Sequence, residues 1–189
     1  MSLSHPGEIY YLPGMGGRLD LGLGEELIRR GYSLCGRETV GAFKKLNFKD
    51  KINAVKQDLM GEFWTPEARV IANSFGAYLF LHAQLELEPF PGRVLLLSPI
   101  VGGTSHSETG MRFYPPRAVL LKQAADNGNF RTSAIVAVHV GENDWQAGPQ
   151  ALKDFCNAAG IGLDRPLYQL ASSQLCSNRI ASIARLMRK

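Results

Sequence analysis

The sequence has few cysteines and no long apolar run, and no secretory signal is visible in it. Its 189 residues include three cysteines, Cys35, Cys156 and Cys176. This odd number, at no spacing typical of metal ligands, indicates thiols in a reducing compartment rather than a disulfide framework. Residues 1–7 lack the basic and apolar regions of a signal peptide, and the longest apolar runs are too short to cross a bilayer. We therefore expect a cytoplasmic protein with no membrane span and no metal site or cofactor.

The sequence also lacks a strong excess of either charge. It carries 21 basic and 17 acidic residues, for a net charge of +4. The densest basic stretch, residues 44–56, has no exposed aromatic companions of the kind that nucleic-acid binding requires, and it is interpreted as a solvated loop and helix face. Nucleic acid is therefore excluded as a partner. Hydrophobic residues make up 45% and charged residues 20%, which is typical of a globular chain.

Short apolar segments alternate with amphipathic ones along the chain. Apolar runs predict strands at 8–12, 32–36, 69–72, 94–97, 134–140 and 167–170. Helical spacing predicts helices at 19–30, 48–63, 75–87, 117–125, 150–159 and 174–187. Continuously apolar strands that alternate with helices indicate a parallel sheet covered on both faces. The sequence thus predicts one α/β domain over residues 1–189, a three-layer α/β/α sandwich with a six-stranded, mainly parallel sheet.

One connection breaks this rhythm. The segment after the fourth strand is long enough to suggest a lid-like insertion at about 102–130. Met111, Phe113 and Tyr114 would then offer an apolar wall to a bound acyl group. The alternative is an ordinary crossover helix at 117–125 with a long lead-in.

The most informative residues surround Ser74. An apolar strand leads directly into this serine, and a helix follows it. A nucleophile on such a tight turn projects above the sheet beside a helix N-terminus, which favours developing negative charge. The turn requires small residues two positions before and after the serine, and these are Ala72 and Gly76. The competing interpretation is a plain helix N-cap.

With this serine turn, the chain resembles the α/β-hydrolase family, in a small form that lacks the first two strands of larger members. The resemblance implies a sheet order of second, first, third, fourth, fifth and sixth strand. It also implies Ser74 as nucleophile, with the amides of Met15, beside Gly14, and Phe75 as the oxyanion hole. Asp144, which follows the fifth strand, would be the acid that orients an imidazole. Glu142 is the alternative carboxylate, and Trp145 would form another wall of the substrate site.

The sequence departs from the family where the catalytic histidine should follow the last strand. There is no histidine after His139, and Gln174 is the residue that aligns with the missing base. A glutamine amide cannot accept the serine proton near neutral pH. His106, in the loop after the fourth strand, is the candidate substitute base, and its alternative is a plain surface histidine. His5, in the terminal segment, His82, too far along its helix, and His139, inside a strand, are not candidates.

Two functions therefore stay open. The first is a serine hydrolase, an esterase or thioesterase, that acts on a small acyl ester and releases the acyl group to water. The second is a catalytically inactive hydrolase-fold protein that binds a small ligand or a protein partner. A homodimer is compatible with either. A dinucleotide-binding reading of Gly14 and Gly16, with Glu38 on the ribose, is disfavoured because Leu19 stands where the third glycine is needed.

Overall fold

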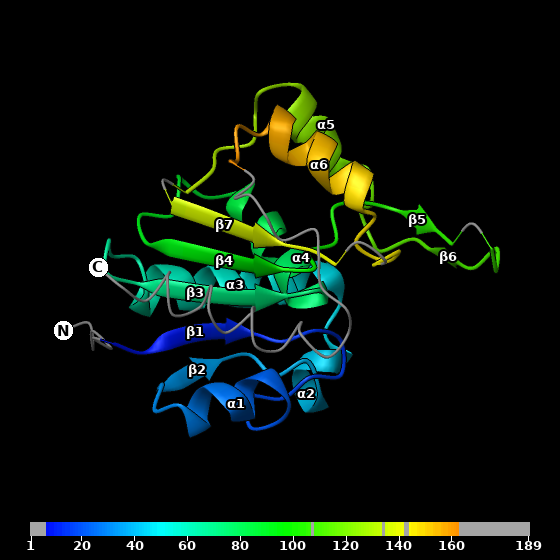
Figure 1. Ribbon diagram of the computed structural model, residues 1–189. Coiled ribbons are helices and arrows are strands. Elements are labelled where there is room, and N and C mark those ends of the chain that lie inside the picture. Colours follow the sequence, from blue (N-terminus) through cyan, green and yellow to red (C-terminus); the bar gives the residue numbers. More distant parts are fainter. Residues whose placement is uncertain (1–6, 107, 134, 142–143, 163–189) are drawn as a thin grey trace.

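The computed structural model of the protein describes residues 7–106, 108–133, 135–141 and 144–162 (Figure 1). Five strands form a parallel sheet in the order β2–β1–β3–β4–β7. They are β1 (Ile9–Leu12), β2 (Leu34–Gly36), β3 (Arg69–Asn73), β4 (Arg93–Leu97) and β7 (Ile135–His139). The predicted fold class and the order of the first five predicted strands are confirmed. The strand expected at 167–170 and the helix expected at 174–187 lie outside the described residues.

Six helices accompany these strands within the described part of the chain: five lie between strands and the sixth follows β7. They are α1 (Leu23–Arg29), α2 (Gly41–Lys45), α3 (Phe48–Glu62), α4 (Phe75–Gln84), α5 (Leu120–Asp126) and α6 (Pro149–Ala158). The sequence predicts loop where the short helix α2 lies. The helix was missed because only Phe43 of its five residues is buried, so its sequence carries little periodic signal.

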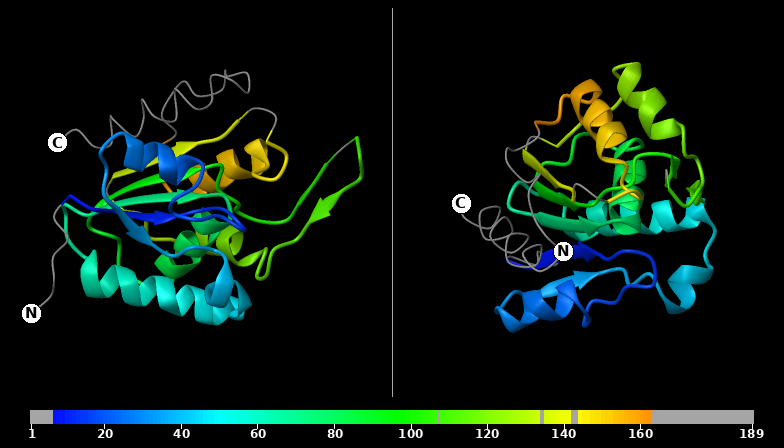
Figure 2. Two further views of the ribbon diagram at one scale, coloured as in Figure 1. Left: turned by 90° about the horizontal axis from the view of Figure 1, so that it is seen from below. Right: turned by 45° about the vertical axis from the view of Figure 1, so that its right-hand side comes forward.

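The two faces of the sheet bury alternate residues of each strand, as a pleated strand requires. On β1, Tyr10 and Leu12 join the larger core beneath α3 and α4, while Ile9 and Tyr11 join a smaller core beneath α1. Figure 2 shows α1 and α3 on opposite sides of the strands. These layers correspond to the predicted sandwich, and α4 is enclosed so completely that all ten of its residues are buried.

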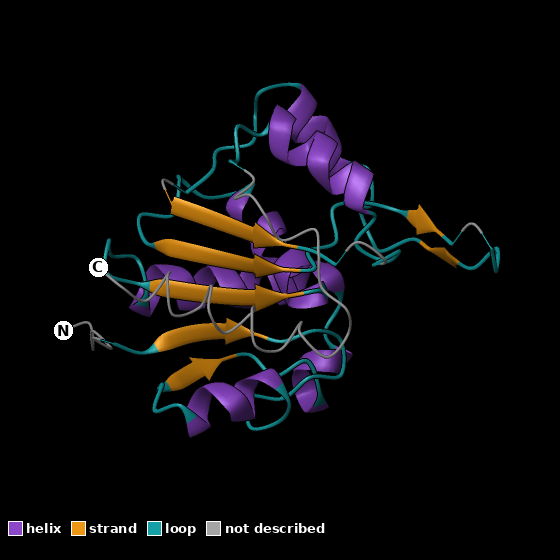
Figure 3. Ribbon diagram, in the orientation of Figure 1, coloured by secondary structure: helices purple, strands orange, loops and turns teal. Residues whose placement is uncertain are grey.

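The segment expected as a lid contains a β-hairpin as well as α5. Strands β5 (Thr104–Ser105) and β6 (Arg112–Phe113) pair antiparallel. The hairpin projects beyond the carboxyl ends of the sheet strands (Figure 3). Each of its strands has only two residues, which is too short for an alternating apolar pattern to be recognised in the sequence.

After β1 the chain adds β2 on one side of β1, and from β2 it crosses over to add β3 on the other side of β1. In parallel sheets, ligands bind at the carboxyl ends of strands where the order reverses in this way. The loops that follow β1 and β3 therefore meet where the fold favours a site. In the described residues, no helix combines the length and the apolar character needed to span a membrane.

Candidate active site around Ser74

Ser74 lies on a strained turn between β3 and α4. Its backbone has φ 50° and ψ −114°, a region that a residue with a β-carbon occupies at a cost of about 1–3 kcal/mol. The turn is held by the Ser74 N–H, which donates to the Leu97 carbonyl at 2.8 Å, and by the Tyr78 N–H, which donates to the Ser74 carbonyl at 3.0 Å. The Ser74 hydroxyl does not cap α4. The backbone thus has the form that a nucleophile turn needs, and the N-cap interpretation does not describe it.

Gly76 shows why the turn needs a small residue. A β-carbon at this position would stand 2.6 Å from the Pro13 carbonyl oxygen and nearer still to the Leu12 carbonyl. From the sequence, the need for a small residue at position 76 is expected to come from the turn itself. The structure instead places the closest atoms on the neighbouring strand β1, so Gly76 allows the turn to approach the loop that follows β1.

That loop, residues 13–17, lies directly against Ser74. A β-carbon on Gly14 would be 3.4 Å from the Ser74 β-carbon. The Gly17 N–H donates to the Gly14 carbonyl at 2.9 Å, and Gly16 has φ 76°, as in a tight turn with glycine at its third position. Gly14 and Ser74, predicted to share a site, are therefore neighbours.

The two predicted oxyanion amides belong to this loop and to the start of α4. The Met15 side chain is 64% exposed, whereas Phe75 is buried and its ring packs against Phe48 and Tyr78 at centroid distances of 6.3 and 6.4 Å. Within the described residues, neither amide donates a hydrogen bond to the protein. Both N–H groups are thus without an acceptor among the described residues.

Asp144 follows β7 at the same carboxyl edge of the sheet. β7 is two strands from β3, or about 10 Å at the usual strand spacing. One carboxylate oxygen, Oδ1, accepts from the Ala147 N–H at 3.1 Å, and the Gly148 N–H donates to the Asp144 carbonyl at 3.1 Å. The carboxylate therefore stabilises its own turn through one oxygen. Glu142, the alternative acid, lies outside the described residues.

His106 lies on the β5–β6 hairpin rather than against Ser74. Its Nδ1 accepts from the Thr109 N–H at 3.2 Å, and its ring meets Trp145 edge-on at a centroid distance of 5.5 Å. An Nδ1 that accepts places the proton of a neutral imidazole on Nε2. To take a proton from Ser74 through Nε2, the ring would have to change tautomer and the hairpin would have to approach the sheet.

The three residues predicted to form an acyl wall, Met111, Phe113 and Tyr114, have different environments on or beside the same hairpin. Met111 and Tyr114 are 51% and 71% exposed, and Phe113 is half-buried against the larger core. The Tyr114 ring covers Gly103, where a β-carbon would stand 2.5 Å from it. Met111 and Tyr114 therefore face solvent.

The remaining residues considered from the sequence are either buried or outside the described residues. His82 and His139 are buried. Enclosure among Phe48 and Tyr78, together with the nearby charge of Arg117, lowers the pKa of His82 to about 4. His5, Gln174 and Cys176 lie outside the described residues. Among the residues that are described, no group of three or more His, Cys, Asp or Glu side chains is arranged to hold a metal ion.

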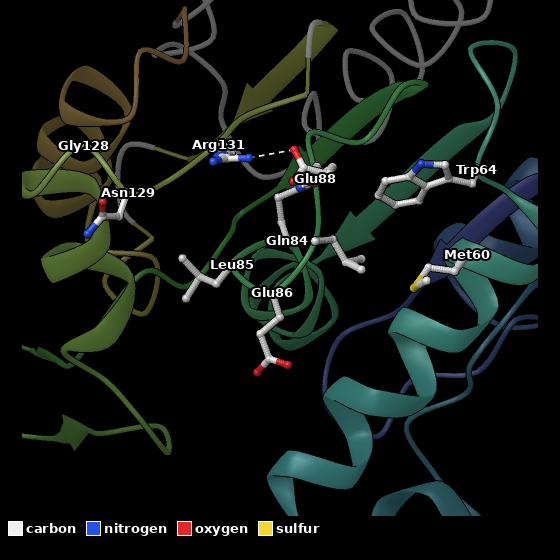
Figure 4. A pocket seen from close by; sticks show the side chains of 10 residues that line it. Met60, Trp64, Gln84, Leu85, Glu86, Glu88, Gly128, Asn129 and Arg131 are labelled. Atoms are coloured by element: carbon white, nitrogen blue, oxygen red, sulfur yellow. Dashed lines mark hydrogen bonds and ion pairs between the residues drawn. The ribbon is translucent and has the colours of Figure 1, made fainter.

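Figure 4 shows a cavity of about 700 Å³. It is lined by residues near the ends of α3 and α4, among them Trp64 and Glu88. Helix α4 runs back along the sheet from Ser74, so its last residues lie about 15 Å from its start. The charged groups in this cavity are engaged, since Arg131 bonds to Glu88 at 2.7 Å. None of the predicted site residues lines it.

Sequence reasoning missed two residues beside Gly14. The Thr39 hydroxyl bonds to both Gly14 and Gly17, and the Asn73 side-chain nitrogen would be 3.6 Å from a β-carbon on Gly14. Glu38, considered above as a ribose ligand, accepts from the Leu19 N–H at 3.1 Å instead. Asn73 could have been noticed as the neighbour of the serine, but no pattern connects Thr39 with a loop more than twenty positions earlier.

Solved structures with a similar fold include an α/β-hydrolase domain protein and esterases. The mouse α/β hydrolase domain-containing protein 10 matches with a TM-score of 0.67 at 13% identity, over 97% of this chain and 90% of that one. A lipase-esterase related protein from Clostridium acetobutylicum matches with a TM-score of 0.63 at 12% identity, over 98% and 96% of the two chains. Esterase B from Lactobacillus rhamnosis, with a tributyrin phosphonate, matches at 0.54 and 12% identity, over 95% and 75%.

No family model and no curated protein sequence matches the chain. The chain therefore has the α/β-hydrolase fold, as the sequence resemblance suggested. At identities of 12–13%, the likeness establishes this fold alone.

Proposed function

We propose that the protein is a serine hydrolase, an esterase or thioesterase, that acts on a small acyl ester through Ser74. The observation that carries the proposal is the backbone of Ser74, at φ 50° and ψ −114° with a hydroxyl that leaves α4 uncapped. Strain of this kind persists only where surrounding contacts enforce it, and it is concentrated at active sites. A serine needed only for folding would gain more by capping the helix.

In the proposed reaction, the Ser74 oxygen bonds to the acyl carbon and its proton passes to a base. The amides of Met15 and Phe75 hold the oxygen of the tetrahedral intermediate, and each such donor contributes about 3–4 kcal/mol in related chemistry. The alcohol or thiol then leaves with the proton. Water adds to the acyl-enzyme, and the carboxylic acid departs as Ser74 regains its proton.

The proposal assigns the base to His106 and its orientation to Asp144. His106 is the one described histidine that the core does not enclose, since His82 and His139 are buried. Its neighbour Trp145 is adjacent to Asp144 in sequence and contacts the imidazole. The hairpin would bring His106 over the carboxyl ends of β3 and β4 when substrate is bound, with Met111 and Tyr114 covering the acyl chain.

The second candidate function is a hydrolase-fold protein that binds a ligand or partner without catalysis. Two observations favour it. Gln174 stands at the sequence position of the usual base, and the Nδ1 of His106 is engaged with Thr109. Slow or absent turnover would follow from a serine whose proton has no acceptor.

A fluorophosphonate probe distinguishes the two functions. We expect stoichiometric labelling of the wild type, none of Ser74→Ala, and undiminished labelling of Ser105→Ala, a matched change at an exposed serine. Intact mass and peptide mapping give the stoichiometry and the site. Labelling that His106→Gln abolishes supports the recruited base. A folded wild type that is unlabelled from pH 6 to 9 would mean that the binding protein is the correct interpretation.

A further inference from the structure

We propose that Thr39 is a positioning residue that holds the loop with the Met15 amide in place against Ser74. The inference rests on the proposed function and adds a residue that neither the serine motif nor the fold identifies. Thr39 lies in the connection after β2, twenty-two positions after Gly17. Only the packing of that connection against the loop after β1 brings the two together.

The contacts of Thr39 enclose the turn at Gly14–Gly17 from one side. Its hydroxyl donates to the Gly14 carbonyl and accepts from the Gly17 N–H at 2.9 Å. Its own N–H donates to the Gly17 carbonyl at 3.0 Å. One residue thus bonds to both ends of the turn that contains Met15, and it does so at 3% exposure, where water cannot easily replace a lost partner.

The connection that carries Thr39 is itself attached to the body of the protein. Asp58 of α3 receives two bonds from the Arg37 guanidinium, each 2.6 Å long, and a bond from the Tyr10 hydroxyl at 2.7 Å. Between Arg37 and Thr39, Glu38 accepts from the Leu19 N–H at 3.1 Å. Thr39 therefore transmits the position of α3 and β1 to the loop.

The position of the loop matters because Gly14 touches Ser74. The Gly14 backbone is so near that a β-carbon on it would be 3.4 Å from that of the serine. An oxyanion donor acts only when its N–H lies within hydrogen-bond reach of the developing charge. A small displacement of the turn would thus move the Met15 amide off the oxyanion and leave the fold in place.

The test compares Thr39→Val with Thr39→Ser. Valine keeps the volume and removes the hydroxyl, whereas serine keeps the hydroxyl and loses a methyl group. Thr132→Val is the matched control, because the Thr132 hydroxyl donates to a backbone carbonyl at 2.8 Å in the segment before β7, at the opposite edge of the sheet. The measurements are the rate constant for fluorophosphonate labelling, kcat and KM for a small activated ester such as p-nitrophenyl acetate, and the thermal midpoint.

We expect Thr39→Val to lower the labelling rate and kcat about 10- to 100-fold with KM nearly unchanged, because the oxyanion forms only in the transition state. Thr39→Ser should remain within about threefold of the wild type, and Thr132→Val should keep the wild-type labelling rate and kcat. A purely structural role would reduce the active fraction in step with stability in all three variants and would leave the rate per labelled molecule unchanged.

The outcomes separate this proposal from the function on which it rests. If the wild type is not labelled at Ser74, the hydrolase function fails and the positioning role with it. If the wild type is labelled and Thr39→Val is labelled at the same rate, only the role of Thr39 is overturned. If Thr39→Val and Thr39→Ser lose rate equally, the hydroxyl is not the responsible group and the proposal is again overturned.

Discussion

The two halves of the candidate site are built differently. Around Ser74, Gly14 and Thr39, backbone groups approach one another closely and are fixed by hydrogen bonds from buried residues. Around His106 and Asp144, the support is a two-residue hairpin, an edge-on ring contact and a turn that bonds to itself. The comparison teaches that the groups which would stabilise the oxyanion are prearranged, whereas the groups which would move the proton must be brought into position.

This difference has a physical basis. An oxyanion hole is made of main-chain amides and acts through its fixed geometry, which rewards rigidity. A lid that admits substrate and then excludes water has to move. A tightly bonded half beside one with fewer contacts is therefore compatible with a hydrolase, and the following substitutions test this contrast through stability.

The largest effect should come from Gly76→Ala. The added methyl would meet the carbonyls of Leu12 and Pro13, which are backbone atoms that cannot turn away. We expect a loss of about 3 kcal/mol or more in the free energy of unfolding, or no folded protein at all. Urea denaturation followed by circular dichroism measures it.

Gly103→Ala in the hairpin half is the matched change. Its methyl would meet the ring of Tyr114, which is 71% exposed and free to rotate, so the loss should stay below about 1 kcal/mol. Gly61→Ala, at an open position of α3, should stabilise by up to about 1 kcal/mol. Equal losses for Gly76→Ala and Gly103→Ala would remove the contrast between the halves.

The next effect concerns His82, near the end of α4, whose ring packs against Phe48 and Tyr78. Burial, the largest cause, and Arg117 together lower its pKa to about 4, while Glu86 opposes the change. Because the folded pKa lies below the ordinary value of 6.5, stability from the neutral ring is complete above pH 6.5 and falls as the pH drops toward 4. From this group alone, the free energy of unfolding should fall by about 2 kcal/mol between pH 7.5 and pH 5.

His82→Phe should reduce that pH dependence, since neither ring nitrogen has a hydrogen-bond partner within the described structure and a phenyl ring suits the contacts with Phe48 and Tyr78. Chemical denaturation of both proteins at the two pH values measures it. An unchanged slope in the variant would show that other groups govern the acid sensitivity.

The smallest contrast compares two carboxylates. Asp58→Asn removes the charge that holds Arg37 and weakens its bond from Tyr10. It should lower the free energy of unfolding by about 1–2 kcal/mol, a range already reduced for the partly exposed guanidinium. Asp126→Asn breaks an exposed pair with Lys122 on α5 and should change stability by less than about 0.5 kcal/mol. Denaturant midpoints of the two variants measure these losses. Equal midpoints would contradict the larger stabilising role assigned to Asp58.

Much of the fold could be predicted from the sequence because its signals are local. The apolar runs ending at Leu12, Leu97 and Val140 predict strands without reference to partners, and the serine between a strand and a helix places Ser74 at the edge of the sheet. The hairpin at β5–β6 and helix α2 were missed because two to five residues are too few for a periodic pattern.

The candidate site was predicted less completely than the fold. Ser74, Gly14 and Asp144 follow strands whose carboxyl ends lie at one edge of the sheet, so their placement at that edge could be inferred from topology. The role of Gly76 could not be assigned to the Leu12 and Pro13 carbonyls, because that contact joins segments more than sixty positions apart. His106 could be proposed as a base, but its bond with Thr109 and its contact with Trp145 depend on how the hairpin folds.

By itself, the amino-acid order determined that this chain forms a parallel α/β sheet, that a serine ends its third strand, and that no histidine follows the fifth. Each of these depends on periodicity or residue identity within a few positions. The tertiary structure alone decided that Ser74 is strained and leaves α4 uncapped, that Thr39 forms hydrogen bonds with the loop of residues 13–17, and that His106 lies on a projecting hairpin. These features arise from contacts between segments distant in sequence, whose geometry is set only when the sheet and its helices pack together.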